Sequence, residues 1–271
     1  YVERHLHIMN NIVENNQVVC STEGGYGGGI DIYGGLVVRI VHNTIKNNHA
    51  SDPINPWGGG MRLRYTAMPS IVQGNTISFN SVSAQGTGGG IGGGIGLADT
   101  RGITVADNKF QGNFGSYGGG IGDVTSSGTL IQANEFVGNF ADTSGGGMYS
   151  AESNLTISGN LFKQNSAFYG GGVLCAVGDY AVTNNLIVDN EAEWGGGFFY
   201  AQLPSQNYLT RIINNTIAEN LADVAGAIAL LDAKTVLVNT ISWGNSASLA
   251  PEIQVQGGEL HTAYSDIRFG A

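Results

Sequence analysis

The sequence predicts an all-β protein, a single-stranded right-handed parallel β-helix solenoid of about nine coils. Three observations predict it. The pattern Asn-x-[Ile/Phe]-x-x-Asn recurs along the whole chain, a run of glycines follows almost every copy, and the period is about 25 to 33 residues. In such an array each unit contacts mainly its neighbours, so we expect residues 1–271 to form one domain.

The two motifs mark the corners of each coil. Asn and Gly tolerate the left-handed backbone of tight corners, and stacked Asn amides satisfy corner groups that would otherwise be buried without partners. The Asn motif starts at Asn10, Asn43, Asn75, Asn108, Asn134, Asn160, Asn185 and Asn215, and a ninth copy at Asn239 closes one residue late with Asn245. The glycine runs are Gly27–Gly29, Gly58–Gly60, Gly92–Gly94, Gly118–Gly120, Gly145–Gly147, Gly170–Gly172 and Gly195–Gly197.

Short strands with alternating residues fill the space between the corners. The unit at residues 155–175 breaks into three such strands, and Leu155, Ile157 and Phe162 fit their alternation. Stacking the coils would align the inward residues in two ladders. The first is Ile12, Ile45, Ile77, Phe110, Phe136, Phe162, Ile187, Ile217 and Ile241, and the second is Ile30, Met61, Ile95, Ile121, Met148, Val173, Phe198 and Ile228.

The composition of the chain argues against several classes of function. The net charge is −10, and the 11 Lys and Arg residues form no basic run, so nucleic-acid binding is not expected. No apolar run approaches the ~18 residues of a membrane span. The chain starts at Tyr1 rather than Met, which suggests a mature protein or an excised segment of a longer chain. Cys20 and Cys175 belong to distant coils, so we expect two free thiols and no zinc site.

One repeat motif is similar to that of a known family. Phe110-Gln-Gly-Asn113 is followed by Gly118-Gly-Gly-Ile121, and the motif returns at residues 136–148 and 162–173. It resembles the repeat of polymorphic outer membrane proteins, although glycine here usually replaces the family's alanine. More broadly the chain looks like the pectate-lyase-like parallel β-helix superfamily. The resemblance implies an extracellular, glycan-facing role and does not separate binding from catalysis.

A charged group on the outward face of the N-terminal coils is the candidate catalytic site. In a lyase, Arg62 or Arg64 would neutralise a uronate or act as the base, and Tyr33 would protonate the leaving oxygen. Asp31 and Asp99 are the candidate oxygen ligands of a Ca²⁺ ion, the one cofactor considered. The alternative is a set of solvated charges, with Asp31 and Arg62 forming a cross-coil ion pair worth under ~1 kcal/mol.

Aromatic and apolar residues form the candidate binding surface. Aromatic residues precede the glycine runs at Tyr26, Trp57, Tyr117, Tyr169 and Trp194, where they would stack on sugar rings or on each other. An outward apolar stripe follows the C-terminal glycine runs at Tyr149, Leu174, Phe199, Ala229 and Leu231. We expect this stripe to be exposed, and Leu174 and Phe199 are the candidates for self-association unless a flanking segment covers them.

These patterns favour a secreted or cell-surface β-helix, adhesin-like, that binds a polysaccharide or a surface protein through a flat sheet face and the aromatic ladder. The first alternative is a polysaccharide lyase or glycoside hydrolase that acts on an acidic polysaccharide. The second is a structural segment of a filament or an autotransporter passenger. The scarcity of long insertions argues against an enzyme, because clefts need walls.

Overall fold

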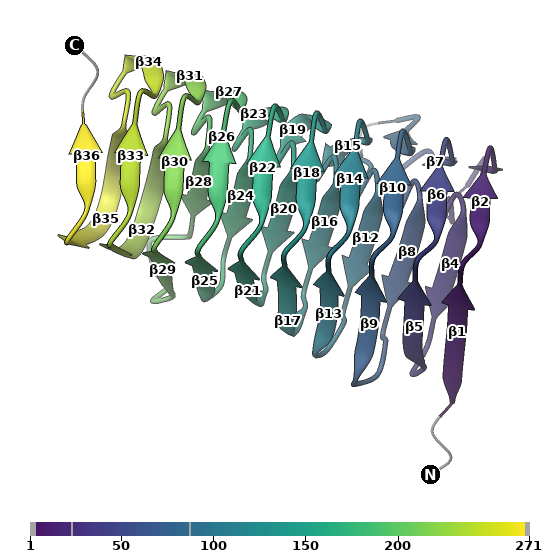
Figure 1. Cartoon of the computed structure of the whole chain (residues 1–271). Coiled ribbons are helices and arrows are strands. Elements are labelled where there is room, and N and C mark those ends of the chain that lie inside the picture. The colour runs from purple at the N-terminus through teal and green to yellow at the C-terminus, as the bar shows by residue number, and fades with distance from the viewer. Residues whose placement is uncertain (1–3, 23, 87, 269–271) are drawn as a thin grey trace.

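The computed structural model describes residues 4–22, 24–86 and 88–268, and this part of the chain contains strands and no helix. All strand pairs are parallel, and each strand pairs with its equivalent in the next coil. Figure 1 shows the coils stacked along one axis from the N-terminal to the C-terminal end. Three sheets of 17, 10 and 9 strands result, which confirms a parallel solenoid of about nine coils.

Each coil contains four short strands rather than the three expected, because a corner divides one face into two. We name the four sets of stacked strands rows 1 to 4. Row 1 contains β4 (Ile30–Tyr33), β8 (Met61–Arg64), β12 (Ile95–Ala98), β16 (Ile121–Val124), β20 (Met148–Ala151), β24 (Val173–Ala176) and β28 (Phe198–Ala201). Row 2 contains β1 (His5–Met9), β5 (Val37–Val41), β9 (Ser70–Gln73), β13 (Ile103–Ala106), β17 (Ser127–Gln132), β21 (Asn154–Ser158), β25 (Tyr180–Thr183) and β29 (Leu209–Ile213). The long strands β32 (Ile228–Val238) and β35 (Ile253–Ala263) run through both rows and join them into one sheet.

The other two rows form one sheet each. Row 3 contains β2 (Ile12–Glu14), β6 (Thr44–Lys46), β10 (Thr76–Ser78), β14 (Lys109–Gln111), β18 (Glu135–Val137), β22 (Leu161–Lys163), β26 (Leu186–Val188), β30 (Thr216–Ala218), β33 (Ile241–Trp243) and β36 (Asp266–Arg268). Row 4 contains β3 (Gln17–Val19), β7 (His49–Asp52), β11 (Ser81–Ala84), β15 (Phe114–Tyr117), β19 (Phe140–Ser144), β23 (Ser166–Tyr169), β27 (Glu191–Trp194), β31 (Leu221–Val224) and β34 (Ser246–Leu249).

Both predicted ladders lie in the interior, together with inward residues of row 2 such as Ile40, Val72 and Ile157. The first ladder needs a correction at each end. Its central phenylalanines stack face to face, with Phe136 4.6 Å from both Phe110 and Phe162 between ring centroids. Ile12 and Ile241, however, are 69% and 47% exposed. Val13 pairs with Ile45, and Ser242 pairs with Ile217. A slip of one residue moves a side chain to the opposite face of a strand, so the predicted register was wrong in these two coils.

The asparagines form two continuous hydrogen-bonded ladders at the corners on either side of row 3. Asn43 donates to Asn75 Oδ1, both from its backbone N–H (2.8 Å) and from its side-chain amide (3.0 Å). Its amide also reaches back to the carbonyl of Ile8 in the preceding coil. The first ladder begins at Asn11 and has Thr240 in the last full coil, so the motifs assigned at Asn10 and Asn239 were placed one residue early.

The glycine runs form the corner between rows 4 and 1. The first glycine of a run has a positive φ, as at Gly118 (74°), and the next two pass close to the backbone of the neighbouring coil. A Cβ on Gly119 would lie 2.5 Å from the carbonyl oxygens of Gly146 and Phe140. The run is therefore required by a tight turn and by close stacking, as the repeat predicts.

Gly119→Ala should destabilise the protein by about 2 kcal/mol, because the new methyl group meets backbone that cannot rotate away. Gly138→Ala is the matched control. Gly138 has a φ of 61° but open space around a Cβ, so its substitution should cost only about 1 kcal/mol of conformational strain. Urea unfolding measures both. Equal losses of unfolding free energy in the two variants would show that the close backbone approach does not exclude a side chain at Gly119.

Both cysteines are free, as predicted. Cys175 lies in row 1 with its side chain directed inward, and it is fully buried.

Candidate functional site

The predicted charged group lies on the outward face of row 1, in the first three strands of that row. Asp31 of β4 pairs in register with Arg62 of β8, and Tyr33 pairs with Arg64. Parallel stacking therefore places residues far apart in sequence in adjacent positions. The predicted cross-coil ion pair is present, since Arg62 donates to both Asp31 oxygens at 2.7 and 3.0 Å.

Arg62 is fixed on three sides. Its guanidinium lies 3.8 Å from the ring centroid of Tyr26 and 5.9 Å from that of Tyr33, in addition to the two bonds to Asp31. Only 5% of Arg62 is exposed. The sequence suggested a solvated surface ion pair. The structure shows instead a buried guanidinium that is held by a bidentate carboxylate and by an aromatic face, and such a pair is stronger.

A second ion pair follows one coil later. Arg64 donates from Nε to Asp99 at 3.0 Å and from Nη2 to the Tyr65 hydroxyl at 2.9 Å. Thr125 donates to the other oxygen of Asp99 at 2.9 Å. Tyr65 also packs edge to face on Tyr33, with ring centroids 5.5 Å apart. Both aspartates proposed as Ca²⁺ ligands therefore have arginine partners.

These contacts bear on catalysis. Burial lowers the pKa of Arg64, but hydrogen bonds to Asp99 and Tyr65 outweigh it and raise that pKa above its ordinary value. Arg64 thus keeps its proton and is a poor general base. Arg62 directs Nε and Nη2 at Asp31, so these two donors are not available to a substrate carboxylate.

Two adjoining cavities form a groove beside these ion pairs. One, of about 300 Å³, is lined by Tyr26, Trp57, Arg62, Arg64, Ala98, Asp99, Val124 and Thr125. The other, of about 260 Å³, is lined by Tyr65, Thr66, Asp99, Arg101 and Thr125. Asp99 and Thr125 belong to both. We call this continuous surface the N-terminal groove.

Arg101 differs from the other two arginines of the N-terminal groove. It is exposed, and its side chain has no hydrogen-bond or ionic partner in the described part of the chain. Asp31 and Asp99 neutralise two of the three arginines at the N-terminal groove. The groove therefore has one excess positive charge, although the net charge of the chain is −10.

A family model described as a right-handed β-helix region matches residues 73–211, just over half of the chain. The chain belongs to this right-handed β-helix family. No curated protein and no solved structure matches it significantly.

In this β-helix the predicted aromatic ladder is interrupted. Ile91 stands between Trp57 and Tyr117, and Ser144 stands between Tyr117 and Tyr169. The interruptions separate the aromatic residues into groups. Tyr117 packs on Tyr149 in the middle, with ring centroids 5.3 Å apart. Tyr26 and Trp57 line the N-terminal groove, whereas Tyr169, Trp194 and Phe199 line a separate hollow of about 190 Å³.

The C-terminal apolar stripe is not exposed as expected. Leu174 and Phe199 are only 5% and 6% exposed. Tyr169 and Trp194, at the ends of row 4 strands, lean across the glycine corner and pack on the stripe. The ring of Tyr169 lies 5.5 Å from that of Phe199. The prediction was wrong because it treated the sheet face as flat, whereas the corner brings two rows into contact.

No group of three or more His, Cys, Asp or Glu side chains in residues 4–22, 24–86 and 88–268 is placed to hold a metal ion. No helix in this range could span a membrane.

Sequence reasoning did not select Thr125 or Arg101 as site residues. Arg101 follows the end of β12 as one more charged residue. Only the structure shows that Arg101, unlike Arg62 and Arg64, has no ionic partner among the described residues. Thr125 carries no signal in the sequence, because it lies in a corner where many residue types occur.

Proposed function

We propose that this β-helix is an extracellular or cell-surface, adhesin-like protein that binds a glycan in the N-terminal groove. The observation that carries the proposal is the combination of an aromatic wall, paired polar groups and one unpaired cation in one continuous groove. The resemblance of the repeats to those of polymorphic outer membrane proteins agrees with such a role.

The lining suits a carbohydrate. Tyr26 and Trp57 offer half-buried aromatic rings, which pack against the apolar faces of sugars. Asp99 and Thr125 provide oxygen atoms for hydroxyl groups, since paired oxygens still have free lone pairs. Arg101 is free to bind a carboxylate or sulfate, so an acidic sugar is the preferred ligand.

Binding without cleavage is favoured over the lyase or hydrolase alternative. A lyase needs a base near neutral pKa and a free cation for the substrate carboxylate. Arg101 could neutralise that carboxylate, but the base is lacking. The raised pKa of Arg64 keeps its guanidinium protonated, and Arg62 is held by Asp31.

Arg101→Ala and Trp57→Ala should each weaken binding roughly tenfold, because each removes an anchor from the groove worth more than 1 kcal/mol. The measurement is retention on an array of oligosaccharides from pectate, alginate, hyaluronan and chondroitin sulfate, followed by titration. Arg211→Ala and Trp243→Ala are the matched controls, because both residues are exposed and lie on rows 2 and 3. Equal losses in the controls, or no retention of any glycan, would refute the proposal.

A further inference from the structure

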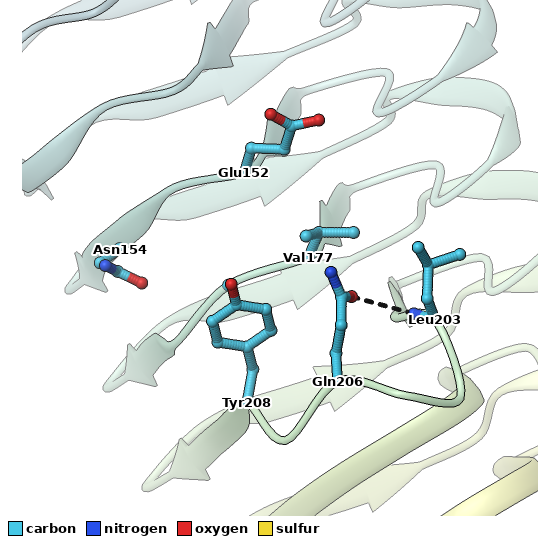
Figure 2. Close-up of a pocket in the computed structure, with 7 residues that line it drawn as sticks. Glu152, Asn154, Val177, Leu203, Gln206 and Tyr208 are labelled. Carbon is cyan, nitrogen blue, oxygen red and sulfur yellow. Dashed lines mark hydrogen bonds between the residues drawn. The ribbon is translucent and has the colours of Figure 1, made fainter.

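A second cleft lies at the corner between rows 1 and 2, in the three coils that follow the N-terminal groove. It has a volume of about 410 Å³ and is lined by Glu152, Asn154, Val177, Gly178, Leu203, Gln206 and Tyr208. Figure 2 shows these side chains, with residues 203–208 forming one wall as a loop. We call it the loop cleft.

The loop is an insertion of this one coil. The chain takes five residues to pass from Ala176 to Ala181, and it takes ten to pass between the paired positions Ala201 and Arg211. The insertion therefore builds a wall that the other coils lack at this corner.

Hydrogen bonds hold this wall in place. Within the loop, the Gln206 N–H donates to the Leu203 carbonyl at 2.9 Å, and the Leu203 N–H donates to Gln206 Oε1 at 3.1 Å. At the end of the loop, the Leu209 N–H donates to Asp179 at 2.8 Å, and Lys234 of the following coil donates to Asn207. The loop cleft is thus formed before any ligand arrives, which lowers the entropic cost of binding.

Its polar groups are oriented by their own contacts. Asn154 Oδ1 accepts from the Asp179 N–H at 3.0 Å, and Gln206 Oε1 accepts from Leu203. Both side-chain NH₂ groups therefore remain as donors. Glu152 has no side-chain hydrogen-bond or ionic partner in the described residues, so its carboxylate remains as an acceptor. In Figure 2 the Gln206 nitrogen and the Tyr208 hydroxyl are on the side of the loop that faces Glu152.

We propose that the loop cleft is a second glycan subsite that takes a neutral sugar. Two amide donors, one carboxylate acceptor and a tyrosine ring match the hydroxyl groups and the apolar face of a sugar. An acidic sugar is disfavoured, because the lining contains Glu152 and no Lys or Arg. A Ca²⁺ ion would need more oxygen ligands than the one carboxylate provides.

The cleft adjoins the N-terminal groove. Thr125 of the groove and Glu152 of the cleft occupy equivalent corner positions in successive coils, and the Thr125 N–H donates to the carbonyl of Ala151. One glycan that follows this corner would therefore meet both surfaces. This inference rests on the proposed function in taking the ligand to be a glycan, but it concerns a different set of residues.

The test is a titration of the ¹⁵N-labelled full chain with methyl β-D-glucoside, methyl β-D-galactoside and methyl α-D-mannoside, followed by NMR. We expect saturable shifts at Gly178 and Tyr208 with at least one probe. Glu152→Ala and Tyr208→Ala should each raise its Kd at least tenfold. Glu219→Ala is the matched control and should leave the Kd unchanged, because Glu219 is also an exposed corner glutamate with a φ of 56°, against 53° for Glu152.

The inference fails if no probe gives saturable shifts at the cleft, if CaCl₂ alone produces the same shifts, or if Glu219→Ala loses as much affinity as Glu152→Ala. Arg101→Ala separates the two proposals. It should weaken the binding of acidic oligosaccharides roughly tenfold and leave the neutral-probe Kd unchanged. Failure of the acidic array alone would therefore overturn the groove proposal and not this one.

Discussion

Between pH 4 and neutral pH, the stability of Asp123→Asn relative to wild type should rise by about 3 kcal/mol. Asp123 lies in row 1 with its side chain directed into the interior, where it is fully buried. Ser150 donates to one carboxyl oxygen at 3.0 Å, and the other oxygen has no partner in the described part of the chain. Burial raises the pKa of Asp123 to about 6, and the hydrogen bond from Ser150 lowers it by less than burial raises it.

The sign of the pH dependence follows from that raised pKa. Between about pH 4 and 6 the folded protein holds a proton on Asp123 that the unfolded chain has released. The contribution of this group to stability is therefore complete below pH 4 and declines as the pH rises to about 6. Above that the folded state contains a buried charge, and a difference of about two pKa units corresponds to about 3 kcal/mol. Asparagine does not titrate and avoids this cost.

Urea unfolding of wild type and Asp123→Asn at several pH values between 4 and 7.5 measures the effect. The difference in unfolding free energy should grow with pH across this range and then level off. Asp223→Asn is the control, because Asp223 is exposed on row 4 and should give a difference near zero at every pH. A difference for Asp123→Asn that does not change with pH would contradict the assignment.

Replacing Asn134 by alanine should destabilise the protein by roughly 3 to 5 kcal/mol, because it breaks several buried hydrogen bonds. The Asn134 oxygen accepts from both the backbone and the side chain of Asn108, each at 3.0 Å. Its amide donates to the carbonyl of Val105 and to Asn160. Alanine would leave a buried N–H and a buried carbonyl unpaired, which is the costly case.

Two further variants test this explanation by urea unfolding. Asn134→Thr should lose less than Asn134→Ala, because Thr240 occupies the equivalent position in the last ladder step and still accepts from Asn215. Asn55→Ala, at an exposed loop position, should change stability by less than about 0.5 kcal/mol. If Asn134→Ala costs no more than Asn55→Ala, the ladder does not stabilise the fold.

Much of this fold could be predicted, because the same corner chemistry is repeated in every coil. The prediction failed where the sequence allows two placements of the repeat motif. Asn10 and Asn11 are adjacent, and either can start the motif, so the pattern does not decide which one enters the ladder. At the other end Thr240 replaces the asparagine, and the nearby Asn239 was mistaken for it. Local sequence identifies the unit, but pairing with the next coil sets the register.

The site was predictable only in part. Stacking places Asp31 beside Arg62, so that pair followed from the spacing of the repeat. Whether an arginine is free depends on its neighbours in three dimensions, and for this reason Arg101 was passed over. Leu174 is buried because Tyr169 crosses the glycine corner and packs on it. The period of the repeat gives no information on the direction of this side chain.

We propose that the N-terminal groove binds an acidic glycan without cleaving it. The most direct measurement combines binding and product formation in one sample, in which the protein is incubated with each acidic oligosaccharide that it retains on the array. We expect saturable binding that Arg101→Ala weakens roughly tenfold, with no absorbance of unsaturated uronates and no new reducing ends, with or without Ca²⁺. Product that accumulates in wild type and disappears in Arg62→Ala or Arg64→Ala would contradict the account and assign the groove to catalysis.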